Sequence, residues 1–340
     1  MARRRDRDVV DAASRRVSDA VATPGALPPA DLDVAGARAA LARHARSFRF
    51  AGLFLPGDRL DTAAVVYAFC RAVDDAVDEA PSLLAAQAEA AALQAELHGR
   101  APPRPTVAAF LAVARREGID VRYAAELVQG VASDAVARLA VADDEELLRY
   151  CYRVAGTVGG LMCGVLGVRD PRAVPHAVDL GIGMQLTNIC RDVLEDAHKG
   201  RVYLPATRLG DAGIDASTFI DDVVARRESV VATARVVRAL LNVADRYYAS
   251  AEAGMRFIPA RSRLAILVAS RVYRAIGTKL LARDADALQG RMATTLLEKV
   301  GCALGALVAF LVPSAASSAA SHNASLHVPL RGLPGAAPLA

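Results

Sequence analysis

Four acidic side chains follow an apolar run in the stretch YAFCRAVDDAVDE, residues 67–79. Asp74 and Asp78 are four residues apart, so on a helix they project from the same face. Like charges at this spacing destabilise a helix unless something binds between them. A solvated surface cluster would relieve the repulsion, but the preceding turns are apolar on nearly every side. The pattern therefore favours an acidic cluster that faces an interior cleft, with Arg71 able to pair with Asp75 or with an incoming anion.

A second row of polar side chains lies in the stretch GMQLTNICRDVLEDAHKGRVYLP, residues 183–205. Asn188, Asp192 and Asp196 are spaced by four and four, which places them on one stripe of a helix. Gln185 lies one turn before Asn188 on nearly the same face. The positions between these polar residues are mostly apolar, so this helix is also expected to be buried.

The oxygen atoms of the two rows indicate a magnesium site. Carboxylate and amide oxygens are the hard ligands that Mg²⁺ takes, and no histidine or cysteine has a comparable placement that would favour zinc. Mg²⁺ commonly shares its ligands with substrate phosphates, so a diphosphate is the most natural partner anion. An apolar cavity below would hold a long hydrocarbon tail and protect a carbocation from water. The basic side chains beside the rows could clamp phosphate oxygens: Arg71, Arg191, Lys199 and Arg201.

The composition favours helices as the elements that position these side chains. Of the 340 residues, 54% are hydrophobic and only 5% are aromatic, and alanine, leucine, valine and arginine dominate. This bias favours helix over a β-sandwich or barrel. We find no convincing alternation of apolar and polar residues and no glycine-rich turn of the dinucleotide-binding type. The sequence therefore predicts an all-α protein with a sizeable core.

The chain divides into one domain and two ends. Residues 1–30 are charged and then rich in proline and glycine, which predicts a flexible lead-in. Residues 31–312 are expected to form the all-α domain. The tail, residues 313–340, is of low complexity and is expected to be disordered. Helical stretches are predicted near residues 31–50, 61–81, 82–98, 105–117, 120–140, 143–168, 170–198, 215–230, 233–256, 260–284 and 286–312.

Charge and cysteine usage argue against several classes of protein. The formal net charge is +4, from 41 basic and 37 acidic residues, which does not suggest a nucleic-acid-binding protein. The five cysteines are odd in number and lack metal-ligand spacing, so we interpret them as reduced core thiols of a cytoplasmic protein. The N-terminus has no apolar region typical of a secretory signal. No stretch reaches the roughly 20 apolar residues that span a bilayer, so the protein is expected to be soluble or to lie on a membrane surface.

Several stretches together resemble the squalene/phytoene synthase family, the head-to-head prenyl transferases. They occur in the family's order and are highly specific as a set. One further stretch, residues 258–277, resembles a helix of the bacterial phytoene synthases in that family. The matching motifs are the opening H-x-x-S-F segment in HARSFRFAGLFLP (44–56), the first aspartate motif (67–79), the first signature in YCYRVAGTVG (150–159) and the second signature (181–205).

The resemblance implies a fold and a reaction. The fold is a single isoprenoid-synthase-type helical bundle with a central apolar cavity. In the reaction, one allylic diphosphate ionises, the C2–C3 double bond of a second substrate captures the cation, and proton loss gives a cyclopropyl diphosphate that ionises again and rearranges. The expected product is phytoene from two geranylgeranyl diphosphates, the first committed step of carotenoid biosynthesis. Squalene or dehydrosqualene synthesis from farnesyl diphosphate is the alternative, because the sequence does not reveal the floor of the cavity.

The resemblance also implies roles for individual residues. Phe48, Tyr150 and Tyr273 are expected to shape the cation pocket or to meet the departing diphosphate, and His44 and Ser47 match the family as well. The implied catalytic residues are Asp74, Asp78, Asp192, Asp196, Tyr150 and Tyr273. The implied metal ligands are Asp74, Asp78, Asn188, Asp192 and Asp196, and the implied diphosphate-binding residues are Tyr67, Arg71, Gln185, Asn188, Arg191 and Arg201.

The implied cofactor is Mg²⁺, with Mn²⁺ as a substitute, and phytoene formation would need no NADPH. The implied partners are prenyl diphosphate substrates, a peripheral contact with the cytoplasmic membrane and downstream carotenoid enzymes, with no nucleic acid.

The sequence departs from the family pattern in two places, and two alternatives from other classes stay open. A usual tyrosine is missing near Leu139 and Ala140, and only Arg291 and Lys299 stand where the last helix commonly has a basic run. The alternatives are a non-catalytic binding protein and a class I terpene cyclase. Both aspartate rows are intact, which counts against the first. The arrangement N-x-x-R-D-x-x-E-D (188–196) counts against the second.

Overall fold

Helix α4 (Gly57–Asp78) carries the first acidic cluster and is held in the protein by its apolar face. In the computed structural model, Phe69 of this helix is fully buried and stacks on Phe110 of α6, with the ring centroids 4.1 Å apart. Val73, one turn later, is also buried. Each fully buried apolar side chain of this size contributes about 1.5–3 kcal/mol. The apolar turns therefore anchor the charged end of α4.

The structure describes residues 52–312 and 321–336, all of which fall in one compact unit. The predicted lead-in and the residues His44, Ser47 and Phe48 lie outside this range. Helices make up nearly all of the regular structure described, so the prediction of an all-α protein is confirmed. None of the helices described is both long and apolar enough to cross a membrane. After α4 the elements are α5 (Leu83–Leu97), α6 (Pro105–Glu117), α7 (Arg122–Ala132), β1 (Leu139–Ala140), α8 (Asp144–Cys151), η1 (Tyr152–Gly156), α9 (Thr157–Val165), α10 (Ala173–Arg191), α11 (Val193–His198), β2 (Arg201–Val202), α12 (Ala206–Asp211), α13 (Phe219–Val224), α14 (Val230–Gly254), η2 (Met255–Phe257), α15 (Ala260–Leu281), α16 (Leu296–Leu311) and η3 (Ala324–Leu330).

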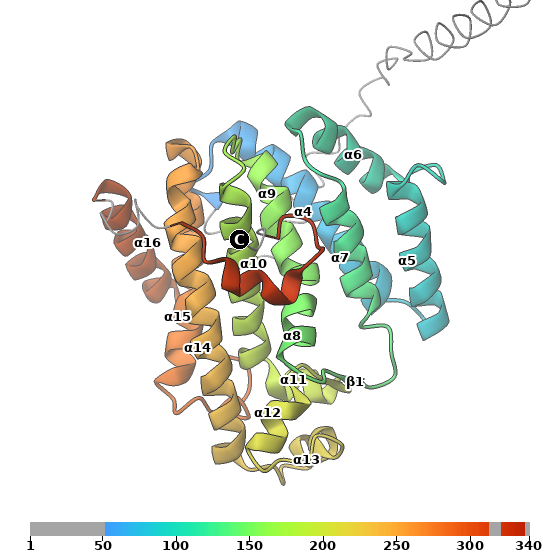
Figure 1. The fold of residues 1–340 in the computed structure, drawn as a ribbon, viewed down its shortest axis with the longest axis vertical. Helices are drawn as coiled ribbons and strands as arrows, with labels where there is room; N and C mark the ends of the chain where they lie inside the picture. Colours follow the sequence, from blue (N-terminus) through green and yellow to red (C-terminus); the bar gives the residue numbers. More distant parts are fainter. Residues whose placement is uncertain (1–51, 313–320, 337–340) are drawn as a thin grey trace, which may run out of the picture. The chain divides into compact units, whose positions relative to one another are not determined.

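Helix α10 is surrounded by other helices. It packs against α14, α9, η1 and α15 (Figure 1). Most of its residues are buried. A helix that is apolar on nearly every side is stable only inside a protein. This is how the second polar row, at the C-terminal end of α10, enters the interior.

Two glycines let α10 approach the preceding helical segment closely. A Cβ atom built on Gly181 would lie 2.1 Å from the carbonyl oxygen of Ala155, and one on Gly159 would lie 2.0 Å from the carbonyl oxygen of Ala177. The contact adjoins the π-helical turn η1, a type of bulge that is frequent at functional sites. The two glycines therefore fix the spacing between α10 and the segment formed by η1 and α9.

The substitution Gly181→Ala is expected to lower the free energy of unfolding by about 1–3 kcal/mol, because the added methyl group must push two backbones apart. The matched control is Gly301→Ala on α16, where a Cβ atom would meet nothing within 4 Å. Alanine favours a helix over glycine, so the control should be neutral or stabilising. Urea unfolding followed by circular dichroism measures both. Equal stability of the two variants would contradict the close approach.

A short parallel strand pair replaces the end of the helix predicted over residues 120–140. Helix α7 ends at Ala132, and β1 pairs in parallel with β2. The prediction is wrong for this part because the backbone bonds to a distant segment instead of to itself: the N–H of Leu139 donates to the carbonyl of Gly200 at 3.1 Å. The pairing places the loop before β1 beside the chain that follows α11.

The prediction of disorder over residues 313–340 is wrong for residues 321–336. These residues include η3, lie against α8 and pass in front of α10 in Figure 1, where η3 is the short red helix. Two buried tyrosines donate hydrogen bonds to the backbone of this segment. The hydroxyl of Tyr247 bonds the carbonyl of Leu326 at 2.9 Å, and that of Tyr152 bonds the carbonyl of Pro334 at 2.6 Å. The low-complexity composition gave no indication of these contacts, because only a few widely spaced side chains anchor the segment.

Candidate active site

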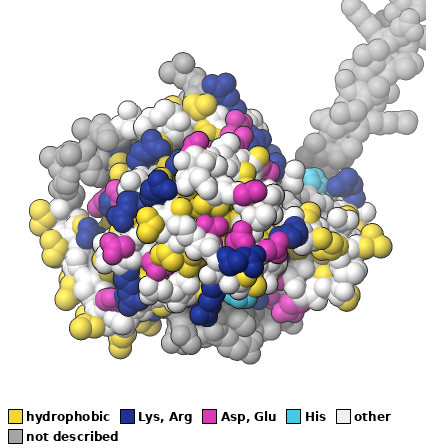
Figure 2. All heavy atoms as spheres, turned by 90° about the horizontal axis from the view of Figure 1, so that it is seen from below, with side chains coloured by type: hydrophobic (Ala, Val, Ile, Leu, Met, Phe, Trp, Pro, Cys, Tyr) yellow, Lys and Arg dark blue, Asp and Glu magenta, His cyan; other side chains and the backbone are white. Residues whose placement is uncertain are grey.

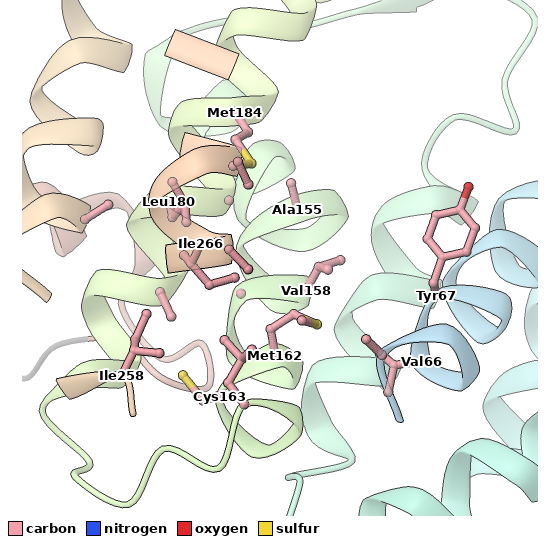
Figure 3. Close-up of a pocket in the computed structure, with 18 of the residues that line it drawn as sticks. Val66, Tyr67, Ala155, Val158, Met162, Cys163, Leu180, Met184, Ile258 and Ile266 are labelled. Carbon is pink, nitrogen blue, oxygen red and sulfur yellow. The ribbon is translucent and has the colours of Figure 1, made fainter. Parts of the chain in front are cut away.

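An apolar cavity of about 380 Å³ lies among α4, α9, α10 and α15 (Figure 3). The predicted central apolar cavity is therefore confirmed. Asp74, Gln185 and Asn188 also line it, each near the C-terminal end of its helix. The apolar side chains labelled in Figure 3 include Val66 of α4, Val158 and Met162 of α9, Leu180 and Met184 of α10, and Ile266 of α15.

The acidic side chains of α4 have three different environments. Asp74 is half-buried and lines the cavity. Asp75 forms an ion pair with Arg71 one turn earlier, as the spacing predicts. Asp78 is 46% exposed and accepts a hydrogen bond of 2.9 Å from Arg201 of β2. One acid therefore faces the cavity, one is neutralised within its own helix, and one reaches toward the segment that follows α11.

The second polar row enters the same end of the cavity. Nδ2 of Asn188 donates to Oε1 of Gln185 at 3.3 Å, and both residues line the cavity. Asp192 lies at a break between α10 and α11 that the sequence did not predict, and both of its oxygens accept hydrogen bonds from Arg191. Asp196 follows one turn later. Asn188, Asp192 and Asp196 stay on one helical face across the break. The N–H groups of Asp192 and Asp196 still donate to the carbonyls four residues earlier, at 2.9 and 2.8 Å.

Asp134, in the loop between α7 and β1, lies close to both acidic groups and was not predicted as a site residue. Its charge contributes to raising the pKa values of both Asp74 and Asp196. Arg201, which binds Asp78, also comes within 4.0 Å of Asp134. The strand pair β1–β2 positions this loop, so the two rows and Asp134 form one polar group at one end of the cavity.

The carboxyl groups of this cluster are poorly compensated. Burial raises the pKa of Asp74 to about 7, and neighbouring carboxylates add to the shift. Burial and the adjacent Asp192 raise the pKa of Asp196 to about 7 as well, and burial raises that of Asp134 to about 6. Carboxyl groups with raised pKa values around a cavity are typical of functional sites. A bound cation would relieve their repulsion.

Two tyrosines hold Asp134 in place. The hydroxyls of Tyr150 and Tyr203 each donate to Oδ2 of Asp134 at 3.0 Å, and their rings stack with centroids 4.8 Å apart. Tyr150 was predicted to shape the cation pocket or to meet the departing diphosphate. It is not among the residues that line the cavity, and its hydroxyl bonds Asp134. Tyr273, the other predicted aromatic, lines the cavity directly. No local sequence pattern marks Asp134, which lies in the loop two residues beyond the end of α7.

The available oxygen atoms fit a hard divalent cation. Oδ1 of Asn188 is buried and has no hydrogen-bond partner among the described residues, so it is available as a ligand beside the carboxyls. Asp74 and Asp196 add further oxygens from the two rows. Asp192 bonds Arg191, but a carboxylate has about four acceptor positions and keeps some for a metal. An all-oxygen set of this kind suits Mg²⁺ or Mn²⁺.

Basic side chains lie beside these oxygens. Arg191 is only 9% exposed, and Arg291 of the loop before α16 lies 3.5 Å from Asp192 and 3.8 Å from Glu195. Arg201 bridges toward the first row. The end of the molecule with α11 and β1, seen from below in Figure 2, shows acidic and basic side chains side by side. The cavity end therefore offers both metal ligands and groups that can bind an anion.

Known proteins are similar to this chain in sequence and in fold. A family profile described as squalene/phytoene synthase matches residues 41–298. The chain belongs to the squalene/phytoene synthase family. It is 39% identical over 279 residues to a phytoene synthase of Pseudescherichia vulneris, covering 78% of this chain and 88% of that protein. It is 36% identical over 298 residues to a 15-cis-phytoene synthase of Enterobacter agglomerans, covering 84% and 95%.

The fold also resembles solved members of the squalene/phytoene synthase family. A dehydrosqualene synthase in complex with ligand matches with a TM-score of 0.72 at 25% identity, over 81% of this chain and 95% of that one. The isoprenoid-synthase bundle implied by the sequence is thus confirmed. The family match includes the cavity and both polar rows but ends at residue 298, so residues 321–336 lie beyond it.

Binding of a divalent cation to this squalene/phytoene synthase is expected to strengthen as the pH rises. With pKa values of about 7, Asp74 and Asp196 retain protons near neutral pH, and these protons must leave before the carboxyls bind a cation. Between about pH 6 and about pH 8 the affinity for Mn²⁺ should rise by up to roughly tenfold per pH unit for each carboxyl. Titration calorimetry of metal-free protein measures this, and an affinity independent of pH would contradict the raised pKa values.

Proposed function

We propose that the protein condenses two geranylgeranyl diphosphates head to head into 15-cis-phytoene, through a cyclopropyl (prephytoene) diphosphate, as the first committed step of carotenoid biosynthesis. The observation that carries the proposal is that one apolar cavity is lined by a residue of each polar row, Asp74 and Asn188. Relatives that are 36–39% identical and named phytoene synthase support the same reaction.

The polar end of the cavity binds the metal and the diphosphates in this proposal. Mg²⁺, or Mn²⁺ in its place, neutralises negative charge on the diphosphate when bound. Its proposed ligands are Asp74, Asp78, Asn188, Asp192 and Asp196. The proposed diphosphate-binding residues are Tyr67, Arg71, Gln185, Asn188, Arg191 and Arg201.

The apolar part of the cavity directs the carbon chemistry. The C1–O bond breaks at the polar end, and the diphosphate leaves with the electron pair. Because the apolar walls exclude water, the allylic cation is captured by the C2–C3 double bond of the second substrate and not by a water molecule. Closure of the cyclopropane releases a proton, which the departing diphosphate can accept. A second ionisation and rearrangement end in proton loss, so no hydride donor such as NADPH is needed.

The length of the cavity favours twenty-carbon substrates over fifteen-carbon ones. Asn188 and Ala173 both line it, at opposite ends of α10. Fifteen residues of helix at 1.5 Å each separate them, which is about 22 Å. An extended geranylgeranyl chain occupies this length, whereas a farnesyl chain would leave the far end empty. The runner-up activities, squalene and dehydrosqualene synthesis, both use the shorter substrate.

The identity of the hydrocarbon product tests the proposal. Purified protein is incubated with Mg²⁺ and either geranylgeranyl or farnesyl diphosphate, each with and without NADPH. Phytoene from geranylgeranyl diphosphate, formed equally well without NADPH, is the expected result. Squalene or dehydrosqualene as the preferred product would overturn the choice of substrate. No hydrocarbon from either substrate would overturn the enzymatic proposal as a whole.

We also propose that the protein lies peripherally on the cytoplasmic face of a membrane, through α16. This helix exposes large apolar side chains: Leu297 is 81% exposed and Leu304 is 61% exposed. Figure 2 shows hydrophobic side chains along its left edge, the side on which α16 lies in Figure 1. An apolar helix face of this kind binds the interface of a bilayer. The hydrocarbon product could then enter the bilayer and reach downstream carotenoid enzymes.

The double substitution Leu297→Ser and Leu304→Ser is expected to weaken binding to phospholipid vesicles by about tenfold or more, because two large apolar groups are lost from the contact. Vesicle flotation measures the bound fraction. The matched control is Leu84→Ser and Val231→Ser, on α5 and α14, whose side chains are 77% and 73% exposed. Equal loss of binding in both pairs would contradict a specific role for α16.

A further inference from the structure

The C-terminal segment brings two histidines onto a buried aspartate of α10. Nε2 of His322 lies 2.8 Å from Oδ2 of Asp179, and Nε2 of His327 lies 2.8 Å from Oδ1. The side chains of Asp179 and His327 are 0% exposed, and that of His322 is 10% exposed. Asp179 does not line the cavity, and both histidines lie beyond the family match. This cluster is therefore separate from the candidate active site.

We propose that Asp179, His322 and His327 bind a first-row transition-metal ion of the Zn²⁺ type. One carboxylate oxygen and two imidazole nitrogens lie within 4.8 Å of one another, so small shifts would bring all three to one ion. Two imidazoles and a carboxylate suit zinc and its neighbours in the first transition row. They differ from the all-oxygen set at the polar end of the cavity, which suits Mg²⁺.

The charge on Asp179 supports a bound cation. Its carboxylate is fully buried, and the two histidines are its only ion-pair partners within residues 52–312 and 321–336. Each oxygen of Asp179 accepts a hydrogen bond from one histidine. Oγ of Ser250 donates a further hydrogen bond. A divalent ion at this position would neutralise the buried carboxylate.

The Nδ1 atom of His322 permits coordination through Nε2. A neutral imidazole binds a metal through the lone pair of one nitrogen and carries its proton on the other. Nδ1 of His322 is buried and has no hydrogen-bond partner in the part of the chain that the structure describes. In the hydrogen bond to the Asp179 carboxylate the ring proton is on Nε2, because a carboxylate only accepts. Since Nδ1 has no competing partner among the described residues, the proton can move to Nδ1 when Nε2 binds the ion.

The ion would fasten the C-terminal segment to the wall of the cavity. His176 lines the cavity, and its ring meets that of His322 edge to face, with centroids 5.0 Å apart. Nδ1 of His176 donates to the carbonyl of Ser250 on α14 at 2.7 Å. An ion on Asp179 would thus hold α10 and residues 321–336 together, and Ser250 of α14 already bonds the same carboxylate. Because it binds only the folded protein, it should raise the melting temperature.

Zinc retention by the full-length protein tests the proposal. The protein is treated with EDTA, freed of chelator, equilibrated with Zn²⁺ in the presence of excess Mg²⁺ and desalted, and the zinc per chain is then measured by elemental analysis. The wild type is expected to retain about one zinc per chain and to melt several degrees higher than the metal-free protein. His322→Ala and His327→Ala should each lose both effects.

Two controls locate the ion. His98→Ala changes an exposed histidine at the end of α5, and Asp74→Asn changes the polar end of the cavity; both should retain zinc. Circular dichroism checks that each variant is folded, and Co²⁺-loaded wild type should show a visible absorption band that His322→Ala loses. Wild-type protein without zinc would overturn the proposal and leave the histidines as hydrogen-bond donors only. Zinc lost from Asp74→Asn but kept in His322→Ala would also overturn it, by placing the ion in the active site.

Discussion

Replacing Asp74 with asparagine is expected to reduce phytoene formation by at least about a thousandfold. Asp74 is the acid of α4 that lines the cavity, facing the row that begins with Asn188. Metal ions contribute several kcal/mol of charge stabilisation at a leaving group, and each 1.36 kcal/mol is a factor of ten in rate. Asparagine keeps the shape of the side chain but removes the charge that would hold the metal.

The same substitution should not destabilise the metal-free protein. Burial raises the pKa of Asp74 in the folded state to about 7, well above its usual value. Above that pH the buried charge of Asp74 lowers the free energy of unfolding. This penalty is lost as the pH falls and the group takes up a proton. At pH 8 the melting temperature of metal-free Asp74→Asn should therefore equal or exceed that of the wild type.

The matched control is Asp58→Asn, in the first turn of α4, whose side chain is 62% exposed. It changes the same chemical group on the same helix at the end remote from Asp74. Its activity should stay within a few-fold of the wild type. If Asp74→Asn behaved in the same way, the assignment of the cavity as the active site would be wrong.

Removal of divalent metal is expected to abolish turnover. The raised pKa values of Asp74 and Asp196 show that negative charge in the cluster is uncompensated without a cation. A diphosphate that entered the metal-free site would be repelled by these carboxylates. EDTA should therefore reduce the rate by at least about a thousandfold, and excess Mg²⁺ or Mn²⁺ should restore it. The rate of product formation from labelled geranylgeranyl diphosphate is measured with and without EDTA.

The His322→Ala variant separates this effect from the proposed zinc site. It should lose activity in EDTA and regain it with Mg²⁺ as the wild type does, because His322 is not at the polar end of the cavity. Full activity of the wild type in chelator would contradict a metal-dependent ionisation. Recovery with Zn²⁺ but not with Mg²⁺ would contradict the assignment of the all-oxygen set to magnesium.

The two polar rows could be predicted because their information is local. Asp74 and Asp78, like Asn188 and Asp192, are spaced by one helical turn, and a turn of helix is decided by neighbouring residues. The pairing of Arg71 with Asp75 follows from the same spacing and is present. Apolar residues around both rows indicated that the rows face the interior.

Asp134 could not be predicted because its place depends on distant parts of the chain. The strand pair joins segments about sixty residues apart, with Leu139 opposite Arg201. The hydroxyls of Tyr150 on α8 and of Tyr203, directly after β2, then fix the carboxyl. No local sequence pattern predicts such a pairing. The docked C-terminal segment was missed for the same reason, since single contacts such as that of Tyr247 with Leu326 hold it.

A crystal structure with Mn²⁺ and a non-reactive thio-analogue of geranylgeranyl diphosphate tests the central claim most directly. Anomalous scattering locates the manganese. Our account predicts manganese within about 2.0–2.2 Å of oxygens of Asp74, Asn188 and Asp196, with the diphosphate between the two rows and the prenyl chain extending along α10 toward Ala173. Manganese and diphosphate bound outside this cavity, with the cavity itself empty, would contradict it.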